Sequence, residues 1–425
     1  MSIEIHKRTL LNKIASWLKR PEIIVIIGPR QVGKTFLVNK ILPQLTDHPI
    51  QYFNFEDFSL RELFKKDPVG FIQGIFDKKQ IYVFDEFQKI PEFTSFLKVA
   101  YDKDKNNFPK IFLTGSSSCE IQKKISESLV GQCITFNLFS LSFLEKFKYA
   151  SSDFLQEITL GNNFRIENLK KETFFKQQDI ARNFAEYILF GGYPELGELE
   201  QEKKWEKLKS ITERILEKDL QGLIKNEHLF SSKKLLEILA YRIGNLISFE
   251  NLASELQLNI KTVRNLTAVL EGLFFFEFIY PKASFANEYK KAPKIYFEDL
   301  GIRNELVKMH NVPTDNSQLG GIVENFVFNQ LRRYVAYKKD FKINFWRDYN
   351  GNEVDFVLTS AKEIISIEIK YRKEQEKRLS AGVENFIKKY KPQFHITATY
   401  DYFGETELDG CKIFFIPAYV FGLII

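Results

Sequence analysis

The chain contains little cysteine. Only three of its 425 residues are of this type, Cys119, Cys133 and Cys411. An odd and scattered set matches neither a disulfide framework nor the paired spacing of a structural zinc site. We therefore expect a protein of a reducing compartment, the cytoplasm, whose fold depends on neither feature.

The chain also lacks a hydrophobic run long enough to cross a bilayer. Its longest apolar stretch, 413–425, is shorter than a membrane span and contains Pro417. The amino terminus is an amphipathic pattern interrupted by lysine and arginine, without the apolar core of a signal peptide. These absences predict a soluble protein without a membrane partner.

Neither sign of charge dominates the composition. Lysine and arginine number 61 and aspartate and glutamate 55, which leaves a net charge of +6. Such an excess permits contact with nucleic acid without demanding it, because solvated lysine-rich surfaces are its commoner cause. The length is sufficient for two or three domains with sizeable cores.

A glycine-rich loop follows an apolar strand expected at 23–27 and precedes a helical pattern. Its spacing, G-x-x-x-x-G-K-T, is that of a phosphate-binding P-loop, in which glycines let successive backbone N–H groups point at a nucleotide. We expect Lys34 to bridge the β- and γ-phosphates and Thr35 to bind Mg²⁺. The residues predicted to bind ATP here are Gly28, Pro29, Arg30, Gln31, Val32, Gly33, Lys34, Thr35 and Phe36.

A second apolar strand, expected at 81–84, ends in two adjacent carboxylates. Asp85 is placed to hold Mg²⁺, and Glu86 to polarise the water that attacks the γ-phosphate. This division of roles predicts hydrolysis in addition to binding, with Lys34 and Glu86 as catalytic residues.

Further strands are expected at 51–55 and 110–113, which makes a parallel sheet. The carboxyl ends of parallel strands meet at one edge, so Thr114 or Ser116 could hydrogen-bond the γ-phosphate. The alternative is that Gly115 and the serines form a turn and cap the next helix.

Several motifs together resemble those of a prokaryotic family of AAA-type P-loop ATPases that carry a carboxyl-terminal domain of unknown function. They cover nearly the whole chain and lie at 28–35, 84–91, 113–118, 141–145, 189–195, 217–220 and 293–301. The resemblance implies an ATPase that uses ATP and Mg²⁺. One position departs from the family, which places arginine where this chain has Gln132.

That departure bears on the rate of hydrolysis. If the family arginine stabilises charge at the γ-phosphate, Gln132 predicts either slow intrinsic turnover or an arginine finger supplied elsewhere. Gln132→Arg should then raise the turnover. Arg30 could compensate in part, although a solvated or packing role near the site is the simpler interpretation.

The middle of the chain contains a helix-turn-helix pattern. Helices are expected at 249–256 and 260–273, followed by strands at 274–280 and 294–297 around a basic loop, as in a winged helix. Side chains that could face DNA are Lys261, Thr262, Arg264 and Asn265 on the second helix and Lys282, Lys290 and Lys291 in the wing. The alternative is a lid or a protein-docking surface.

Four charged residues mark the carboxyl-terminal region, where we expect the order helix, three strands, helix and strand. Glu324 lies on the helix 320–334, Asp355 on the strand 353–358, and Glu368 on the strand 364–369 just before Lys370. Glu368 and Lys370 share a face because side chains alternate along a strand.

This pattern resembles the restriction-endonuclease-like one. The resemblance implies that Glu324, Asp355 and Glu368 hold Mg²⁺ and that Lys370 acts on the attacking water, with Arg347 and Glu353 at the same edge. The alternative for each residue is a surface salt bridge at a strand end.

The sequence thus predicts an α/β protein with four parts. We expect a P-loop AAA-type ATPase domain at 1–150, a helical lid or connector at 151–225, a winged-helix-like domain at 226–300 and a restriction-endonuclease-like α/β domain at 301–425. Hydrolysis of ATP would be coupled to a DNA-binding or nuclease-like domain. The alternatives are a nucleotide-dependent switch that docks a protein partner, and an oligomeric motor that translocates nucleic acid.

Overall fold

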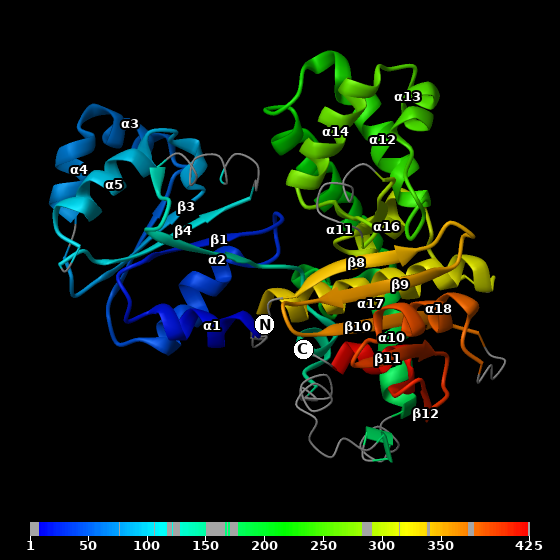
Figure 1. The fold of residues 1–425 in the computed structure, drawn as a ribbon. Helices are drawn as coiled ribbons and strands as arrows, with labels where there is room; N and C mark the ends of the chain where they lie inside the picture. Colours follow the sequence, from blue (N-terminus) through cyan, green and yellow to red (C-terminus); the bar gives the residue numbers. More distant parts are fainter. Residues whose placement is uncertain are drawn as a thin grey trace.

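The fold has three regions, an amino-terminal sheet, a helical middle and a second sheet (Figure 1). The computed structural model describes residues 8–75, 77–105, 107–116, 121, 128–149, 166–167, 169–170, 177–282, 291–313, 315–337, 341–372 and 378–423. Within this part of the chain, no helix is long and apolar enough to span a membrane.

The first sheet has five parallel strands in the order β2-β3-β4-β1-β5. The strands are β1 (Ile23–Ile27), β2 (Ile50–Asn54), β3 (Ile81–Asp85), β4 (Lys110–Gly115) and β5 (Cys133–Asn137). The expected parallel sheet is therefore confirmed, and β5 is a strand that the sequence pattern did not predict. Because all five strands run the same way, the ends of β1, β3 and β4 meet at one edge.

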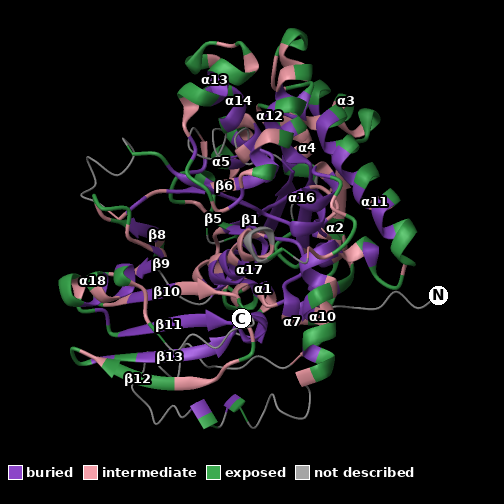
Figure 2. Ribbon diagram, turned by 90° about the vertical axis from the view of Figure 1, so that its right-hand side faces the viewer, coloured by how far each residue is buried: buried purple, intermediate pink, exposed green. Residues whose placement is uncertain are grey.

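Both faces of this sheet are covered, which explains why its central strands are continuous apolar runs. Ile24 and Ile26 of β1 pack into one hydrophobic core, and Ile23, Val25 and Ile27 pack into another on the opposite face. The covering elements are α1 (Leu10–Trp17), α2 (Lys34–Phe36), η1 (Leu37–Ile41), η2 (Leu42–Leu45), α3 (Phe58–Lys66), α4 (Pro68–Ile75), η3 (Phe87–Lys89) and α5 (Phe93–Lys103). The central strands are buried along their length (Figure 2).

The middle region is mostly helical. Its elements are α7 (Phe143–Phe147), α10 (Gln177–Phe190), η4 (Pro194–Leu196), α11 (Gln201–Arg214), η5 (Ile215–Leu220), η6 (Asn226–His228), α12 (Leu229–Tyr241), α13 (Phe249–Leu256), α14 (Ile260–Gly272), β6 (Phe276–Ile279), β7 (Lys294–Phe297) and α16 (Leu300–Leu306). The expected helix pair is present, with Ser248 and Asn259 as the amino-terminal caps.

The two strands expected beside the helix pair are also present. β6 and β7 are antiparallel, and an isolated bridge joins Leu246 to Lys294. The connecting loop 283–290, which includes the predicted wing residue Lys290, lies outside the described residues. The helices and strands therefore agree with the expected order, while the winged-helix interpretation stays a prediction.

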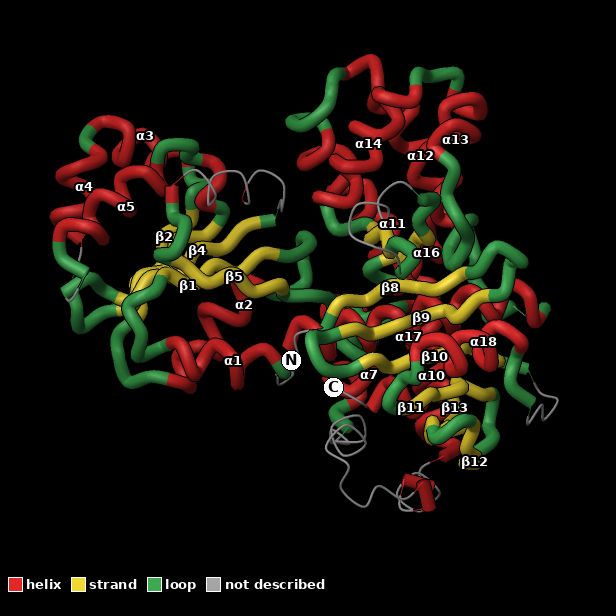
Figure 3. Tube along the Cα trace, viewed as in Figure 1, coloured by secondary structure: helices red, strands yellow, loops and turns green. Residues whose placement is uncertain are grey.

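The second sheet is mixed and has six strands in the order β12-β13-β11-β10-β9-β8. They are β8 (Lys342–Arg347), β9 (Glu353–Thr359), β10 (Ile364–Lys370), β11 (Phe394–Thr399), β12 (Gly404–Leu408) and β13 (Cys411–Pro417). Helix α17 (Asn316–Tyr337) packs on one face and α18 (Ala381–Tyr390) on the other (Figure 3), and the 3-10 turn η7 (Ala418–Leu423) follows β13. The sequence pattern did not predict β12 and β13.

Helix α17 joins the second sheet to the first. The rings of Phe143 and Phe326 meet edge to face with their centroids 6.0 Å apart. The buried Arg333 guanidinium donates to the carbonyl oxygen of Ser140 at 3.1 Å, and the Tyr337 hydroxyl donates to the carbonyl oxygen of Asn137 at 2.9 Å. One hydrophobic core therefore runs from the first sheet through the middle region to the second sheet.

Candidate functional site

The glycine-rich loop leaves β1 at the edge of the first sheet. A Cβ atom on Gly28 would clash with the carbonyl oxygen of Leu138, and Gly33 has a φ of 96°. Glycine is therefore required at both positions, at one by close backbone approach and at the other by a left-handed conformation. Val32 is buried beneath the loop, and Phe36 is partly buried at the start of the helix.

A buried ion pair anchors this loop from below. The Arg8 guanidinium donates to the carbonyl oxygen of Val32 and forms a 3.1 Å ion pair with Glu145. Glu145 also closes a capping box with Ser142 at the start of α7. The motif at 141–145 therefore has a structural role, which is to fix the arginine that holds the loop.

The Lys34 ammonium lies inside the loop. It donates to the carbonyl oxygens of Gly28 at 2.9 Å and Pro29 at 2.8 Å. Burial lowers the pKa of Lys34, although Glu86 and Asp85 oppose that effect. These neutral backbone acceptors leave its charge available to an anionic ligand.

Asp85 is the centre of a hydrogen-bonded group at the ends of β2, β3 and β4. Its carboxylate accepts from the Thr35 hydroxyl at 2.7 Å, from the Tyr52 hydroxyl at 2.6 Å and from the Thr114 hydroxyl. Thr35 and Asp85 therefore present neighbouring oxygens, the donor type that Mg²⁺ prefers, and this pair fits the ion. When bound, Mg²⁺ would neutralise charge on the phosphates.

Glu86 follows Asp85 in a left-handed conformation with a φ of 54°. Its carboxylate accepts from the Ser116 hydroxyl at 3.1 Å and from the Gln88 amide. Burial raises the pKa of Glu86, and the neighbouring Asp85 adds to this effect. The structure thus places Ser116 against the predicted catalytic carboxylate.

Two loop residues contact the middle region. Arg30 forms an ion pair with Asp219 of η5 at 2.5 Å and a second pair with Glu56 at 3.5 Å. The Gln31 amide donates to Glu195 of η4 at 3.3 Å. Sequence reasoning missed the partner residues Asp219 and Glu195, and Arg30 is ion-paired where a solvated or packing role was expected. Glu195 lies in the motif 189–195 and Asp219 in the motif 217–220, and these motifs were the available signal.

Gln132 lies at the opposite edge of the sheet. Its carbonyl oxygen accepts from the amide of Ile23, the first residue of β1, and its side chain donates to Asp102 at 2.5 Å. Strand β1 leads from Ile23 at this edge to Gly28, five residues on, a distance of about 16 Å at 3.3 Å per residue. Gln132 therefore lies away from the loop of its own chain, and its effect on hydrolysis stays a prediction.

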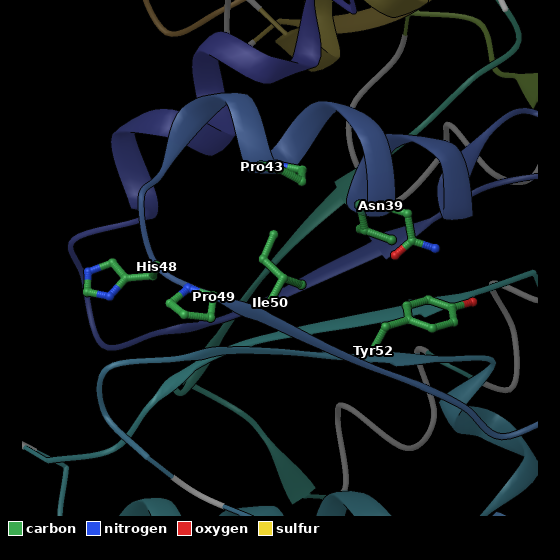
Figure 4. Close-up of a pocket in the computed structure, with 7 residues that line it drawn as sticks. Asn39, Pro43, His48, Pro49, Ile50 and Tyr52 are labelled. Atoms are coloured by element: carbon green, nitrogen blue, oxygen red, sulfur yellow. The ribbon is translucent and has the colours of Figure 1, made fainter.

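A cavity of ≈ 340 Å³ lies between β2 and the helical turns that follow the loop. Figure 4 shows His48 at one end and Tyr52 at the other. Because the Tyr52 hydroxyl also donates to Asp85, the wall of this cavity is connected to the candidate site. Sequence reasoning did not find Tyr52.

In the carboxyl-terminal sheet, the predicted residues meet a lysine that sequence reasoning missed. The Lys294 ammonium, from the first residue of β7, lies 3.0 Å from Glu324 and 3.4 Å from Asp355, and it also forms an ion pair with Glu353. Two signals were available: Lys294 directly precedes the apolar run 295–297, and it lies within the motif 293–301. Burial lowers the pKa of Lys294, but Glu324 and the other carboxylates outweigh this effect and raise it well above its ordinary value.

Glu368 and Lys370 lie beside this group on β10. Ser380 donates to one oxygen of Glu368 at 3.3 Å, and burial, together with Asp355, raises the pKa of Glu368 to about 9. The Lys370 ammonium donates to the carbonyl oxygen of Arg378 at 2.6 Å. Within the described residues, no group of three or more His, Cys, Asp or Glu side chains is arranged to hold a metal ion. The predicted set Glu324, Asp355 and Glu368 therefore does not fit Mg²⁺ as folded.

The predicted DNA-facing residues of α14 are only partly free. Lys261 and Asn265 are exposed. Arg264 lies over the ring of Phe249, 4.4 Å from its centroid, and 3.9 Å from Glu250. The neighbouring acidic side chain weakens the case for a phosphate-binding face.

Comparison with known proteins identifies the first region. Residues 20–147 match the family described as an AAA domain. The amino-terminal part of the chain is thus similar to an AAA-type P-loop ATPase domain, and we call it the ATPase domain. The rest matches two families described as domains of unknown function, DUF8612 over residues 181–312 and DUF4143 over residues 319–419. The restriction-endonuclease-like interpretation of the last region thus stays a prediction.

Relatives with similar sequences extend along most of the chain. Uncharacterized protein MJ1637 of Methanocaldococcus jannaschii is 27% identical over 396 residues, which is 88% of this chain and 81% of that protein. Uncharacterized protein Rv2008c of Mycobacterium tuberculosis is 24% identical over 380 residues, 86% of this chain and 74% of that protein. The ATPase domain and the two regions after it therefore occur together in other proteins.

Among solved structures, the chain is similar to the Walker-type ATPase PABY2304 of Pyrococcus abyssi. The TM-score is 0.42 at 13% identity, and the match covers 71% of this chain and 96% of that one. The RuvB Holliday junction branch migration motor of Thermotoga maritima has a TM-score of 0.32 at 16% identity, covering 64% of this chain and 89% of that one.

Proposed function

We propose that the ATPase domain binds ATP with Mg²⁺ and hydrolyses it. The observation that carries the proposal is the convergence of Lys34 and Thr35 from the loop with Asp85 and Glu86 from β3 at one sheet edge. Lys34 would bind the β- and γ-phosphates, and Thr35 and Asp85 would hold the ion. Glu86 would accept a proton from the attacking water, in a position set by Ser116 and Gln88.

The test is turnover of ATP by the full chain. Lys34→Ala should abolish binding of a fluorescent ATP analogue and release of phosphate, because the loop loses its cation. Lys40→Ala is the matched control, since Lys40 is an exposed lysine of η1 in the same helical segment. ATP turnover that persists in Lys34→Ala would contradict the proposal.

We further propose that the middle region responds to the nucleotide. Support comes from the contacts of Arg30 with Asp219 and of Gln31 with Glu195, which connect the P-loop directly to η5 and η4. A phosphate group that attracts Arg30 would compete with Asp219 for the same guanidinium. Binding of ATP would therefore loosen this contact and change how η5 packs.

Asp219→Asn tests this coupling. The variant should reduce the difference in protease sensitivity between the ATP-bound and nucleotide-free protein, because Arg30 no longer has a charged partner to exchange. Asp179→Asn is the control, since Asp179 forms an exposed ion pair with Arg182 on α10. An unchanged ATP-dependent protection pattern in Asp219→Asn would remove the proposal.

DNA binding or cleavage is a second candidate function of the regions after the ATPase domain. The helix pair α13 and α14 with the strands β6 and β7 supports a winged-helix interpretation, and the gathering of Glu324 and Asp355 supports a nuclease-like one. The Lys294 ion pairs oppose metal-dependent cleavage in the folded state seen here. Duplex nicking that requires Mg²⁺ and is lost in Asp355→Asn would support a nuclease; no nicking would favour a nucleotide-dependent switch that docks a protein.

A further inference from the structure

A lysine from the middle region lies at the centre of the carboxylates of the second sheet. Lys294 forms ion pairs with Glu324 of α17 and with Glu353 and Asp355 of β9, although its side chain is only 4% exposed. Two structural elements, α17 and β9, therefore place three carboxylates around one ammonium. We propose that these carboxylates are an internal cation site occupied by Lys294, so that a divalent metal can enter only when β7 withdraws. The proposal stands independently of the ATPase activity.

Electrostatics explain why the lysine is there. Buried carboxylates need a cation or direct hydrogen-bond donors, because removing their charge from water is costly. Lys370, the basic residue that the sequence suggested, donates to the carbonyl oxygen of Arg378, and Arg347 contacts only the outer carboxylate, Glu353, at 3.5 Å. The inner pair, Glu324 and Asp355, thus takes its ion pairs from Lys294.

The geometry explains why a metal and Lys294 exclude one another. The ammonium lies between Glu324 and Asp355, within 3.4 Å of both, where an ion would have to lie to reach both carboxylates. Tyr296 donates to the same oxygen of Glu324 at 2.5 Å, and the amide of Ile369 donates to the other oxygen of Asp355 at 2.8 Å. A divalent ion needs oxygens at about 2.0–2.6 Å, so the Lys294 ammonium would have to leave before an ion could reach Glu324 and Asp355.

Glu368, which lies beside this cluster, has an oxygen that can accept a further interaction. Among the described residues, one buried oxygen of Glu368 has no hydrogen-bond partner, while Ser380 donates to the other. An arriving metal would supply that partner. Removal of Lys294 would take away the ion pairs of Glu324, Glu353 and Asp355, and a bound cation could replace them.

Lys294 also connects β7 of the middle region to helix α17 of the second sheet, so a movement of β7 would affect both. Asn325 of α17 holds β7 by accepting from the amide of Phe297 at 2.7 Å and donating to its carbonyl oxygen at 2.8 Å. The same helix carries Glu324 and, two turns on, Arg333, which donates to Ser140 of the ATPase domain. Metal access at the second sheet is thus linked through α17 to the position of the first.

Binding of Mn²⁺ to the full-length, nucleotide-free protein, measured by electron paramagnetic resonance, tests the proposal. Wild type and Asp355→Asn should bind the same number of ions, because the occupied cluster contributes none. Lys294→Met should gain one Mn²⁺ per chain, and Lys294→Met combined with Asp355→Asn should lose it again. Methionine is similar to lysine in shape but lacks the terminal ammonium and its three hydrogen-bond donors.

The Mn²⁺ stoichiometries of these variants can support or overturn the proposal. A Mn²⁺ site that wild type possesses and Asp355→Asn lacks would overturn the proposal, and so would a folded Lys294→Met that gains no site. If Lys294→Met does not fold, the comparison of wild type with Asp355→Asn decides alone: equal binding supports an occupied cluster, and unequal binding refutes it.

Discussion

Two sheets of this chain each bring a buried lysine close to carboxylates, but the lysines are bonded differently. In the ATPase domain, Lys34 donates to backbone carbonyl oxygens, and burial lowers its pKa. In the second sheet, Lys294 is paired directly with carboxylates that raise its pKa well above the ordinary value. The first arrangement leaves charges available to a ligand, whereas the second neutralises them within the protein.

The largest effect that we predict lies at the first site. Glu86→Gln should lower the rate of ATP hydrolysis by about 10²–10⁴-fold, because the amide cannot accept a proton from water. Binding of a fluorescent ATP analogue should persist, since Lys34 and the loop are unchanged. Phosphate release and analogue binding, measured on one preparation, check both parts. Equal hydrolysis by wild type and variant would remove Glu86 from the reaction.

The next largest effect tests the second site. Lys294→Met should lower the free energy of unfolding by about 3–5 kcal/mol, because it leaves buried carboxylates without their cation. Lys370→Met is the matched control and should cost less than about 1.5 kcal/mol, since it removes one hydrogen bond to Arg378. Urea unfolding followed by circular dichroism measures both. Similar losses in the two variants would show that the ion pairs of Lys294 are unimportant.

His395 is a buried base of the second sheet that is neutral, whereas the buried Lys294 that contacts this sheet is charged. His395 is fully buried between Ser366 and Thr397, and burial, assisted by the charge of Lys370, lowers its pKa to about 3. Below pH 6.5 the unfolded chain binds a proton at His395 that the folded chain does not, so stability falls as the pH drops from 6.5 toward 3. This residue should cost about 2 kcal/mol at pH 5 relative to pH 7.5.

The measurement is the thermal midpoint of wild type and His395→Gln at pH 7.5 and pH 5. Glutamine does not titrate, so the variant should lose less stability on acidification than wild type. Parallel pH profiles of the two proteins would mean that the folded and unfolded chains bind a proton at His395 equally, so that folding does not lower its pKa.

The smallest effect is expected at the far edge of the first sheet. Gln132→Arg should leave the rate of ATP hydrolysis per chain unchanged at low protein concentration, because the residue lies beside Ile23 and away from the loop. Phosphate release across a dilution series measures it. A faster rate that increases with protein concentration would instead indicate that residue 132 acts on the nucleotide of a second copy.

Local patterns were sufficient to predict the first site. Glycine spacing, apolar strands and the pair Asp85 and Glu86 are all encoded within short stretches, and parallel strands bring their ends together. The expected helices and strands of the middle region and of 316–399 are also present. Strand β13 was not predicted because the run 413–425 is almost wholly apolar and so lacks the alternation of a strand.

The missed contacts join residues far apart in the sequence. Arg30 and Asp219 are 189 positions apart, and Lys294 and Asp355 are 61 apart. No local spacing predicts such pairs, because tertiary packing alone brings them together. The sequence therefore indicated which carboxylates gather in the second sheet but not which cation neutralises them, and that cation decides whether a metal fits.

The shared hydrophobic core limits how the chain can be divided. Phe143 and Phe326 meet edge to face, and Phe139 packs against Tyr337, so residues flanking the ATPase sheet depend on α17 for their cover. A fragment that ends after β5 and α7 would expose these rings to water and aggregate. Recombination that exchanged only one of the three regions would expose the same apolar surface. We therefore expect the three regions to be inherited together.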